Sequence, residues 1–232
     1  MAITVAISSP AREMCHSRWA FDMATLIGYT VAVRPDIRIV SNTSLGTLIV
    51  DQRVDLALEA QKSKCDYILW MDNDMRFPKD ALIRLLNHKK DIVAANYVTR
   101  ELPPVPISFN ITDDKWVRIR TKTDSKGLQK VNGTGMGLML TSMKVFEKMP
   151  RPWFHIGYST VNHKFLGEDI LFCMRAEKLG YETFIDHDLS KQVSHIGSLE
   201  FRHEHVEDDE EIDRMTEIAH KVEAEKVAAA GV

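Results

Sequence analysis

The chain has 232 residues, 44% of them hydrophobic, and a formal net charge of −3. This length and apolar content suit one α/β domain around a single core, and the slightly negative charge excludes any global attraction to nucleic acid or anionic lipid. The sequence has no run of about 18 apolar residues, which a membrane span requires, so we expect a cytoplasmic protein without a signal segment.

Strand-like and helix-like patterns alternate through the first hundred residues. Short runs rich in apolar and β-branched residues predict strands at 3–9, 37–40, 66–71 and 91–97. Helices are predicted between them, over 12–29, from a capping Ser44 to about residue 65, and from Pro78 onward. This alternation predicts an α/β fold of Rossmann-like type with a mainly parallel central sheet.

The pattern changes after residue 100. Short alternating runs predict a small antiparallel region, with strands near 107–111, 116–121 and 128–131. A glycine-rich segment at 132–137 follows, and then helices near 142–148 and 167–179 and a strand at 182–186. The sequence thus predicts a single domain at 1–205, with halves at about 1–100 and 101–205, and a C-terminal amphipathic helix in a tail at 206–232. The tail is expected to dock on the body, with a homodimer contact as the alternative.

The cysteines and the histidine pair near the end of the domain do not have the spacing of a zinc site. Cys15, Cys65 and Cys173 are odd in number and widely spaced in apolar surroundings, which indicates reduced core thiols. His203 and His205 lack the i, i+4 spacing of a zinc-protease helix and are expected in a polar loop.

An acidic turn, Asp72-Asn73-Asp74, follows directly after the apolar run of the third predicted strand. Alternate residues just beyond a buried strand place two carboxylates at the crevice where open α/β sheets bind ligands. Such a pair suits a hard divalent cation that is shared with substrate phosphates and stabilises a departing diphosphate. The alternative is a solvated turn in which Asp74 lies favourably near the start of the next helix.

Four segments, in this order, resemble the GT-A glycosyltransferases, most closely the family 2-like enzymes of bacteria and phages. They are 6–10 (AISSP), 67–74 (YILWMDND), 167–169 (GED) and 194–197 (SHIG). The resemblance covers most of residues 3–197. It implies a GT-A fold and metal-dependent transfer of a sugar from a nucleotide-diphosphate donor, a UDP- or GDP-sugar, to a hydroxyl acceptor. The half at 1–100 would then bind the donor, and the half at 101–205 the acceptor.

The resemblance also implies roles for individual residues. Donor contacts are expected from Ser8, Pro10, Arg12, Arg53 and Asp72. Asp74 would coordinate Mn²⁺ or Mg²⁺ directly, with Asp72 as its partner and His195 completing the site. Oxygen ligands with one imidazole suit these ions. His187, between two aspartates, is the rival of His195 as a ligand.

The second half of the chain contains a candidate general base and two candidate residues for binding the acceptor or the donor sugar. Asp169 is the candidate general base, because a carboxylate can accept the proton of an attacking hydroxyl, and Glu168 could orient the acceptor. The alternative for both is an acidic first helical turn without a function. Gly135 is expected to let the backbone approach the donor sugar, although glycines at 133, 135 and 137 equally suit a turn or bulge.

The identity of the acceptor is open. A glycan is favoured over a modified DNA base, because a solvated face is the preferred interpretation of Arg118, Arg120 and Lys122, which alternation would place on one strand face. Trp153 and Phe154 either stack on an acceptor ring or pack in the core. Two other functions also fit the paired acids: a metal-dependent nucleotidyltransferase, and a nucleotide-sugar-binding module without turnover.

Overall fold

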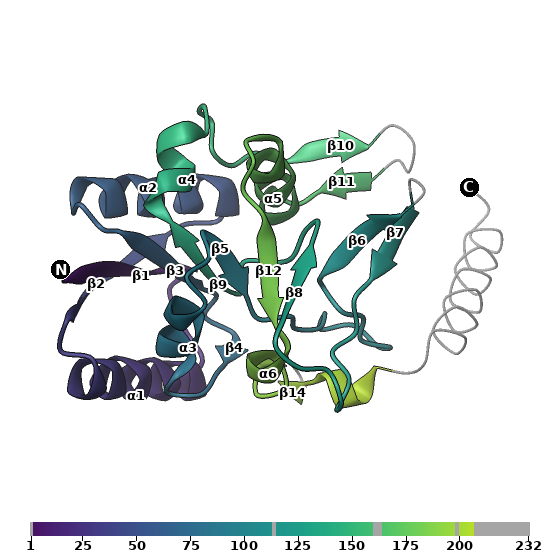
Figure 1. Cartoon of the computed structure of the whole chain (residues 1–232), viewed down its shortest axis with the longest axis horizontal. Helices are drawn as coiled ribbons and strands as arrows, with labels where there is room; N and C mark the ends of the chain where they lie inside the picture. Colours follow the sequence, from purple (N-terminus) through teal and green to yellow (C-terminus); the bar gives the residue numbers. More distant parts are fainter. Residues whose placement is uncertain (1, 113–114, 160–163, 198–199, 207–232) are drawn as a thin grey trace.

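The computed structural model of the chain describes residues 2–112, 115–159, 164–197 and 200–206. A central sheet separates two layers of helices (Figure 1). On one face lie α2 (Ile49–Lys62), α4 (Met143–Lys148) and α5 (Glu168–Lys178), and on the other α1 (Ser17–Val33), α3 (Ala81–Asn87) and α6 (His187–Ser190). The chain therefore has the three-layer α/β architecture that the alternation of patterns predicts.

The central sheet has seven strands in the order β2-β1-β3-β9-β5-β12-β8. These are β2 (Ile37–Leu45), β1 (Ile3–Ala11), β3 (Tyr67–Met71), β9 (Leu138–Ser142), β5 (Ile92–Ala94), β12 (Thr183–Asp186) and β8 (Leu128–Val131). Strand β1 pairs in parallel with β2 and β3, and β12 with β5, whereas β9 is antiparallel to β3 and β5, and β8 to β12. Five strands thus run one way and two the other, which confirms a mainly parallel, Rossmann-like sheet.

Both faces of the sheet are buried, which explains why β3 is apolar throughout. Ile68 and Trp70 belong to the core under α2, α4 and α5. Leu69 and Met71 belong to the core on the side of α1 and α3. Since successive side chains of a strand point to opposite faces, a strand covered on both sides has no polar positions.

Three small antiparallel units surround the central sheet. The first joins β4 (Met75–Arg76), β13 (Ser194–Ile196) and β14 (Glu200–Phe201). The second is the hairpin of β6 (Phe109–Thr112) and β7 (Lys115–Arg118), and the third pairs β10 (Gly157–Ser159) with β11 (Lys164–Leu166). A 3₁₀ turn, η1 (His203–His205), precedes the end of the described chain.

Several predicted boundaries are wrong for identifiable reasons. Strand β2 continues to Leu45 because it pairs with β1 along its whole length, so Ser44 lies in a strand and Leu48 is the N-cap of α2. Residues 128–131 form a strand, but they pair with β12 in the central sheet instead of extending the peripheral antiparallel region. Strand β7 ends at Arg118, so no single strand carries Arg118, Arg120 and Lys122.

The expectation of core thiols is correct for Cys65 and Cys173, which are buried, and wrong for Cys15, which is exposed in the loop before α1. The predicted C-terminal helix and its homodimer contact lie outside the described residues. Within the described ranges, no helix combines the length and the apolar character needed to cross a membrane.

Candidate functional site

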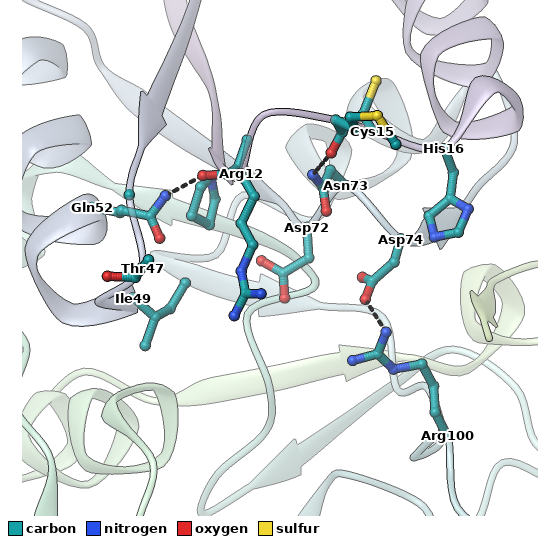
Figure 2. Close-up of a pocket in the computed structure, with 14 residues that line it drawn as sticks. Arg12, Cys15, His16, Thr47, Ile49, Gln52, Asp72, Asn73, Asp74 and Arg100 are labelled. Atoms are coloured by element: carbon teal, nitrogen blue, oxygen red, sulfur yellow. Dashed lines mark hydrogen bonds and ion pairs between the residues drawn. The ribbon is translucent and has the colours of Figure 1, made fainter.

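A polar pocket of about 620 Å³ opens where β1, β2 and β3 end. Its walls come from the end of β1 and the loop that follows, the segment between β2 and α2, the acidic turn after β3, and Arg100 (Figure 2). The lining residues are Pro10, Ala11, Arg12, Met14, Cys15, His16, Gly46, Thr47, Ile49, Gln52, Asp72, Asn73, Asp74 and Arg100. This is the crevice at the carboxyl ends of strands where sheets of this type bind ligands.

Backbone hydrogen bonds hold the acidic turn in place. Strand β3 ends at Met71, the Asp72 N–H donates to the Gly137 carbonyl at 3.0 Å, and the Met75 N–H closes the turn on the Asp72 carbonyl at 3.2 Å. Asn73, between the two aspartates, points its amide the other way and donates to the Met14 carbonyl at 3.2 Å. The turn therefore presents Asp72 and Asp74 to the pocket.

The carboxylate of Asp74 lies between Arg100 and His195. Its Oδ2 atom is 2.8 Å from Arg100 Nη1 and 3.3 Å from His195 Nε2. Burial alone would raise the pKa of Asp74, but the hydrogen bond and charge of His195, together with the charge of Arg100, outweigh it and lower the pKa. The second oxygen, Oδ1, is buried and has no hydrogen-bond partner among the described residues.

His195 is oriented for ligation. Strand β13 pairs with β4, which brings His195 opposite Met75 and beside the acidic turn. The Nδ1 atom lies 3.0 Å from the Val98 carbonyl and therefore carries a proton that it donates. Nε2 is then the ring nitrogen that faces Asp74, and a ring whose other nitrogen is held by a carbonyl has the orientation that metal-binding histidines commonly show.

The residues present fit a divalent cation that takes part of its coordination shell from a ligand. Among the described residues, no group of three or more His, Cys, Asp and Glu side chains is close enough to hold a metal. Asp72 is engaged by Arg53, so the protein offers one close pair, Asp74 and His195, with an unpartnered oxygen at Asp74. Mg²⁺ commonly uses one or two carboxylates and completes its shell with phosphate oxygens and water.

Arg53 connects the acidic turn to the first turn of α5. It is 2% exposed, its Nη2 atom donates to Asp72 Oδ1 at 3.1 Å, and its Nε donates to Glu168 Oε1 at 2.8 Å. Burial disfavours its charge, yet the carboxylates of Asp72 and Glu168 outweigh this and raise its pKa. Arg53 contacts Asp72, which lines the pocket, but Arg53 does not line the pocket itself. Any effect of Arg53 on a ligand in the pocket would therefore act through Asp72.

Burial also raises the pKa of Asp72. The negative charges of Asp74 and Glu168 act in the same direction, and the charge of Arg53 opposes them. In this part of the site Arg53 pairs with Asp72 and Glu168, while Arg100 pairs with Asp74.

Asp169 stands beside this network at the start of α5. Burial, and then the charge of Glu168, raise the pKa of Asp169 to about 6. One carboxylate oxygen accepts from the Ile170 N–H at 2.8 Å, and the side chain folds back over Gly167, where an added Cβ would lie 2.6 Å from Asp169 Oδ1. A carboxylate with this pKa can act as a base near neutral pH.

The structure places the remaining candidates away from the pocket. Ser8 is fully buried within β1, and its hydroxyl has no hydrogen-bond partner among the described residues. His187 is also buried, with Nδ1 2.9 Å from Thr121 Oγ1 and Nε2 2.7 Å from Gln129 Oε1, which removes it as the rival of His195. Trp153 and Phe154 are buried in the core, so packing and not stacking on an acceptor explains them.

Gly135 has a different neighbour from the one expected. An added Cβ at Gly135 would lie 2.1 Å from the hydroxyl oxygen of Tyr97, and one at Gly137 would lie 2.8 Å from the ring of Tyr97. The Tyr97 ring in turn packs edge-on against His195, with centroids 5.4 Å apart. These glycines make room for the tyrosine that supports His195.

Sequence reasoning missed two contributors to the site. Arg100 pairs with Asp74, but in the sequence it is one of many basic residues after a strand. Gln52 lines the pocket and donates to the carbonyls of Ala11 and Ser44, both at 2.6 Å, which ties α2 to β1 and β2. One signal in the sequence could have indicated Gln52 as a pocket residue: it comes directly before Arg53 on the helix that precedes the acidic strand.

The comparisons with known proteins address the fold. No protein-family model and no curated protein matches the sequence. Among solved structures, the chain is similar to the crystal structure of A197 from STIV, with a TM-score of 0.52 and 18% sequence identity over 84% of this chain and 86% of that chain. At this identity the similarity concerns the fold alone, and it extends over most of both chains.

Proposed function

We propose that the chain is a metal-dependent glycosyltransferase of GT-A fold that transfers a sugar from a nucleotide-diphosphate donor to a hydroxyl acceptor. The observation that carries the proposal is the pairing of Asp74 with His195 at 3.3 Å beside a polar pocket of about 620 Å³. The two residues are far apart in the sequence and come together at the carboxyl ends of the strands, where a nucleotide would bind.

In this proposal the pocket holds the donor. Arg12 and Arg100 line it and supply positive charge for the diphosphate. Asp74 and His195, with Asp72 beside them, would hold Mn²⁺ or Mg²⁺, which as a Lewis acid stabilises the negative charge of the leaving diphosphate.

Asp169 is the proposed base for the acceptor. It takes the proton of the acceptor hydroxyl while that oxygen forms its bond to the anomeric carbon of the sugar. The bond between this carbon and the diphosphate oxygen breaks, and the nucleoside diphosphate leaves. Arg53 holds Glu168 and Asp72 in one network, which keeps the start of α5 next to the acidic turn.

An exposed aromatic pair is available on the acceptor side. Tyr158 and Phe165 are 52% and 76% exposed on the β10–β11 hairpin, with ring centroids 5.2 Å apart. The hairpin leads directly into α5, which begins with Glu168 and Asp169. Aromatic faces bind sugar rings, so these two residues replace Trp153 and Phe154 as the proposed contacts of a carbohydrate acceptor.

A panel of nucleotide sugars tests the proposal. The protein is incubated with each donor and Mn²⁺, with and without candidate glycan and modified-DNA acceptors, and the products are identified by mass spectrometry. Release of the nucleoside diphosphate is the expected result. Release of the monophosphate would instead identify a nucleotidyltransferase, and donor binding without turnover would identify a binding module.

Asp74→Asn is expected to abolish Mn²⁺-dependent donor binding, because the amide cannot replace the anionic ligand. Titration calorimetry with the nucleoside diphosphate, in the presence and absence of Mn²⁺, measures this loss. The matched control is Asp124→Asn, which removes an exposed carboxylate that does not line this pocket. If Asp74→Asn binds the nucleotide as the parent chain does, the acidic turn is not the metal site.

A further inference from the structure

Trp116 differs from the other tryptophans of the chain in its exposure. The chain has four tryptophans, of which Trp19, Trp70 and Trp153 are 6%, 0% and 3% exposed, whereas Trp116 is 39% exposed. It lies on β7, in the two-stranded β6–β7 hairpin. A single exposed apolar residue is common on protein surfaces, and it indicates a site only when its surroundings support one.

A stacked partner holds the Trp116 ring in place. The rings of Trp116 and Phe109 lie 4.1 Å apart between centroids, with an angle of 5° between their planes. Phe109 is fully buried, and an added Cβ at Gly133 would lie 2.6 Å from its Cζ atom. The Phe109 N–H also donates to the Gly133 carbonyl at 3.0 Å. One face of the indole therefore rests on a fixed ring of the core, which lowers the entropy cost of binding a flat ligand.

This tryptophan stack is anchored beside the first turn of α5. The point where an added Cβ at Gly133 would meet Phe109 is also 3.7 Å from Ile170 Cδ1. Ile170 directly follows Asp169, the proposed base, in the chain. The stack thus contacts the part of the helix that carries the proposed chemistry.

The Tyr158–Phe165 pair is anchored to the next residue of the same helix. An added Cβ at Gly157 would lie 2.9 Å from Leu171 Cδ1, and alternation along β10 turns Tyr158 to the opposite, exposed face of its hairpin. Successive helical residues point about 100° apart, so Ile170 and Leu171 contact the two hairpins on different sides of α5. Both hairpins lie on the β8 side of the central sheet (Figure 1). Two aromatic platforms, this pair and the tryptophan stack, therefore flank the start of α5.

The charge between the two platforms is negative. The first turn of α5 carries Glu168 and Asp169, and Arg53 is paired with Glu168. A phosphate chain that crossed this turn would be repelled by the carboxylate of Asp169, whereas hydroxyl groups can donate hydrogen bonds to it. The lysine and the arginine of β7 would favour a nucleic acid at one platform only. A chain that contacts both platforms is therefore better matched when it is uncharged and rich in hydroxyl groups.

From this geometry we infer that the two platforms together bind a carbohydrate chain of two or more sugar rings. One ring stacks on Trp116 and another on the pair of Tyr158 and Phe165, because aromatic faces bind sugar rings. The inference deepens the proposed function and rests on it in one respect: the bound chain is then the acceptor, with a hydroxyl group presented to Asp169. Binding of the chain itself requires neither a donor nor a metal.

The test uses the fluorescence of Trp116, which iodide can reach and the buried tryptophans do not offer to it. The full chain, without donor, is titrated with neutral tetrasaccharides of hexoses and of N-acetylhexosamines, and with the matching monosaccharides. A tetrasaccharide is expected to protect the fluorescence from iodide. Its monosaccharide should bind about tenfold more weakly or worse, since one ring occupies one platform only. Absence of protection by every tetrasaccharide would overturn the inference.

Variants at each platform show whether both take part. Tyr158→Ala leaves the tryptophan signal in place and should weaken tetrasaccharide binding about tenfold, and Trp116→Ala, measured by calorimetry, should weaken it by a similar factor. The matched control is Phe21→Ala, which removes a 76% exposed aromatic ring on α1 and should change the affinity less than about twofold. Thermal melts of each variant exclude unfolding as the cause. Unchanged affinity in either platform variant would reject the two-platform surface.

The remaining outcomes separate this inference from the proposed function. Transfer of sugar to a monosaccharide at a rate that Trp116→Ala and Tyr158→Ala leave unchanged would overturn the inference and leave the proposed function standing. Tetrasaccharide binding without release of a nucleoside diphosphate from any donor would support the binding surface and reject the transferase. Stronger, salt-dependent protection by a single-stranded oligonucleotide would overturn the inference in favour of a nucleic-acid surface.

Discussion

The carboxyl group of Asp169 is in surroundings that favour its protonated form. Burial and the neighbouring Glu168 raise the pKa of Asp169 to about 6, against 3.8 for the free side chain. A folded-state pKa above the unfolded one contributes stability that is present below pH 3.8 and lost as the pH rises through about 6. At neutral pH the ionised group therefore lowers stability, which is a cost that a base at a catalytic site commonly carries.

Asp169→Asn is therefore expected to lose transfer and gain stability. Under the proposed function, the transfer rate of the parent chain should rise as the pH passes through about 6 and the carboxylate forms, and the variant should be slower by about 10² to 10⁴. Its melting temperature at pH 7.5 should be higher and its donor affinity unchanged. Rate against pH, calorimetry and thermal melts measure the three quantities. Full transfer in the variant would remove Asp169 as the base.

Gly135→Ala tests what the glycine-rich segment does. The new methyl group would meet the Tyr97 hydroxyl oxygen at 2.1 Å, so overpacking should cost about 1–3 kcal/mol of unfolding free energy. Because Tyr97 packs against His195, Mn²⁺ affinity should also fall. Gly28→Ala is the matched control. Beyond the backbone of α1 itself and the adjacent residues, nothing lies within 4 Å of that Cβ, so the variant should gain about 0.5–1 kcal/mol. Denaturant titration compares them, and an unchanged stability for Gly135→Ala would mean that Tyr97 is free to move.

The sequence predicts residues of the site by type and spacing, and misses their neighbours. Asp72, Asp74 and Asp169 can be named as candidates because acids after a strand or at a helix start form local patterns. The partner of Gly135 is not found, since Tyr97 approaches it from the distant segment that follows β5. Nor does the sequence show that His195 and not His187 meets Asp74, because that choice depends on the pairing of β13 with β4.

At the scale of elements, Arg53 is the connection between α2, β3 and α5. It lies in α2, contacts Asp72 at the end of β3 and Glu168 in the first turn of α5, and its guanidinium lies 5.6 Å from the Trp70 ring centroid. A buried ion pair adds little net stability when intact, but removal of one partner leaves uncompensated charge. The losses of unfolding free energy caused by substitutions at Arg53 and at its partners should therefore be strongly non-additive.

Arg53→Met should lower the unfolding free energy by about 3–5 kcal/mol, because the buried Glu168 and the partly buried Asp72 would lose their cation. The combination of Arg53→Met with Glu168→Gln should lose less than the sum of the two single changes, since the uncompensated charge is reduced. Denaturant titrations of the four chains give this coupling energy. Additive losses would show that Arg53 contributes through packing alone.

Elements with a strong local pattern are predicted closely, and those that depend on pairing are not. The apolar pattern that stops at Gly180 predicts both ends of α5 to within two residues, because helix caps and apolar spacing are local features of the sequence. The pattern at 37–40 gives less than half of β2, whose later residues alternate between exposed and half-buried positions and are held as a strand by β1. Pairing with a distant strand has no local signal.

For the whole molecule, the order of strands decides what can fold alone. Strand β9 comes from the second half of the chain and lies between β3 and β5 of the first half, pairing with both. The two halves described from the sequence therefore share one sheet and one core. The mainly parallel sheet was predictable from alternation, but the insertion of an antiparallel strand at its centre was not.

A fragment of residues 1–100 should fail to fold for this reason. Without β9, strands β3 and β5 lose their common neighbour and expose unpaired backbone groups along two edges. The expected result is a far-ultraviolet circular dichroism spectrum without native helix content and a melt without a cooperative transition, with the full chain as control. A cooperative melt of the fragment would show that the first half is an independent domain.

The exposure of Cys15 gives the natural chain a chemical handle at its polar pocket. Cys15 lines that pocket, while burial raises the pKa of the Cys65 and Cys173 thiols and removes them from solvent. A maleimide dye therefore attaches selectively beside the acidic turn without any engineered cysteine. Fluorescence from that position would report when a ligand enters or leaves, even for a ligand that undergoes no reaction.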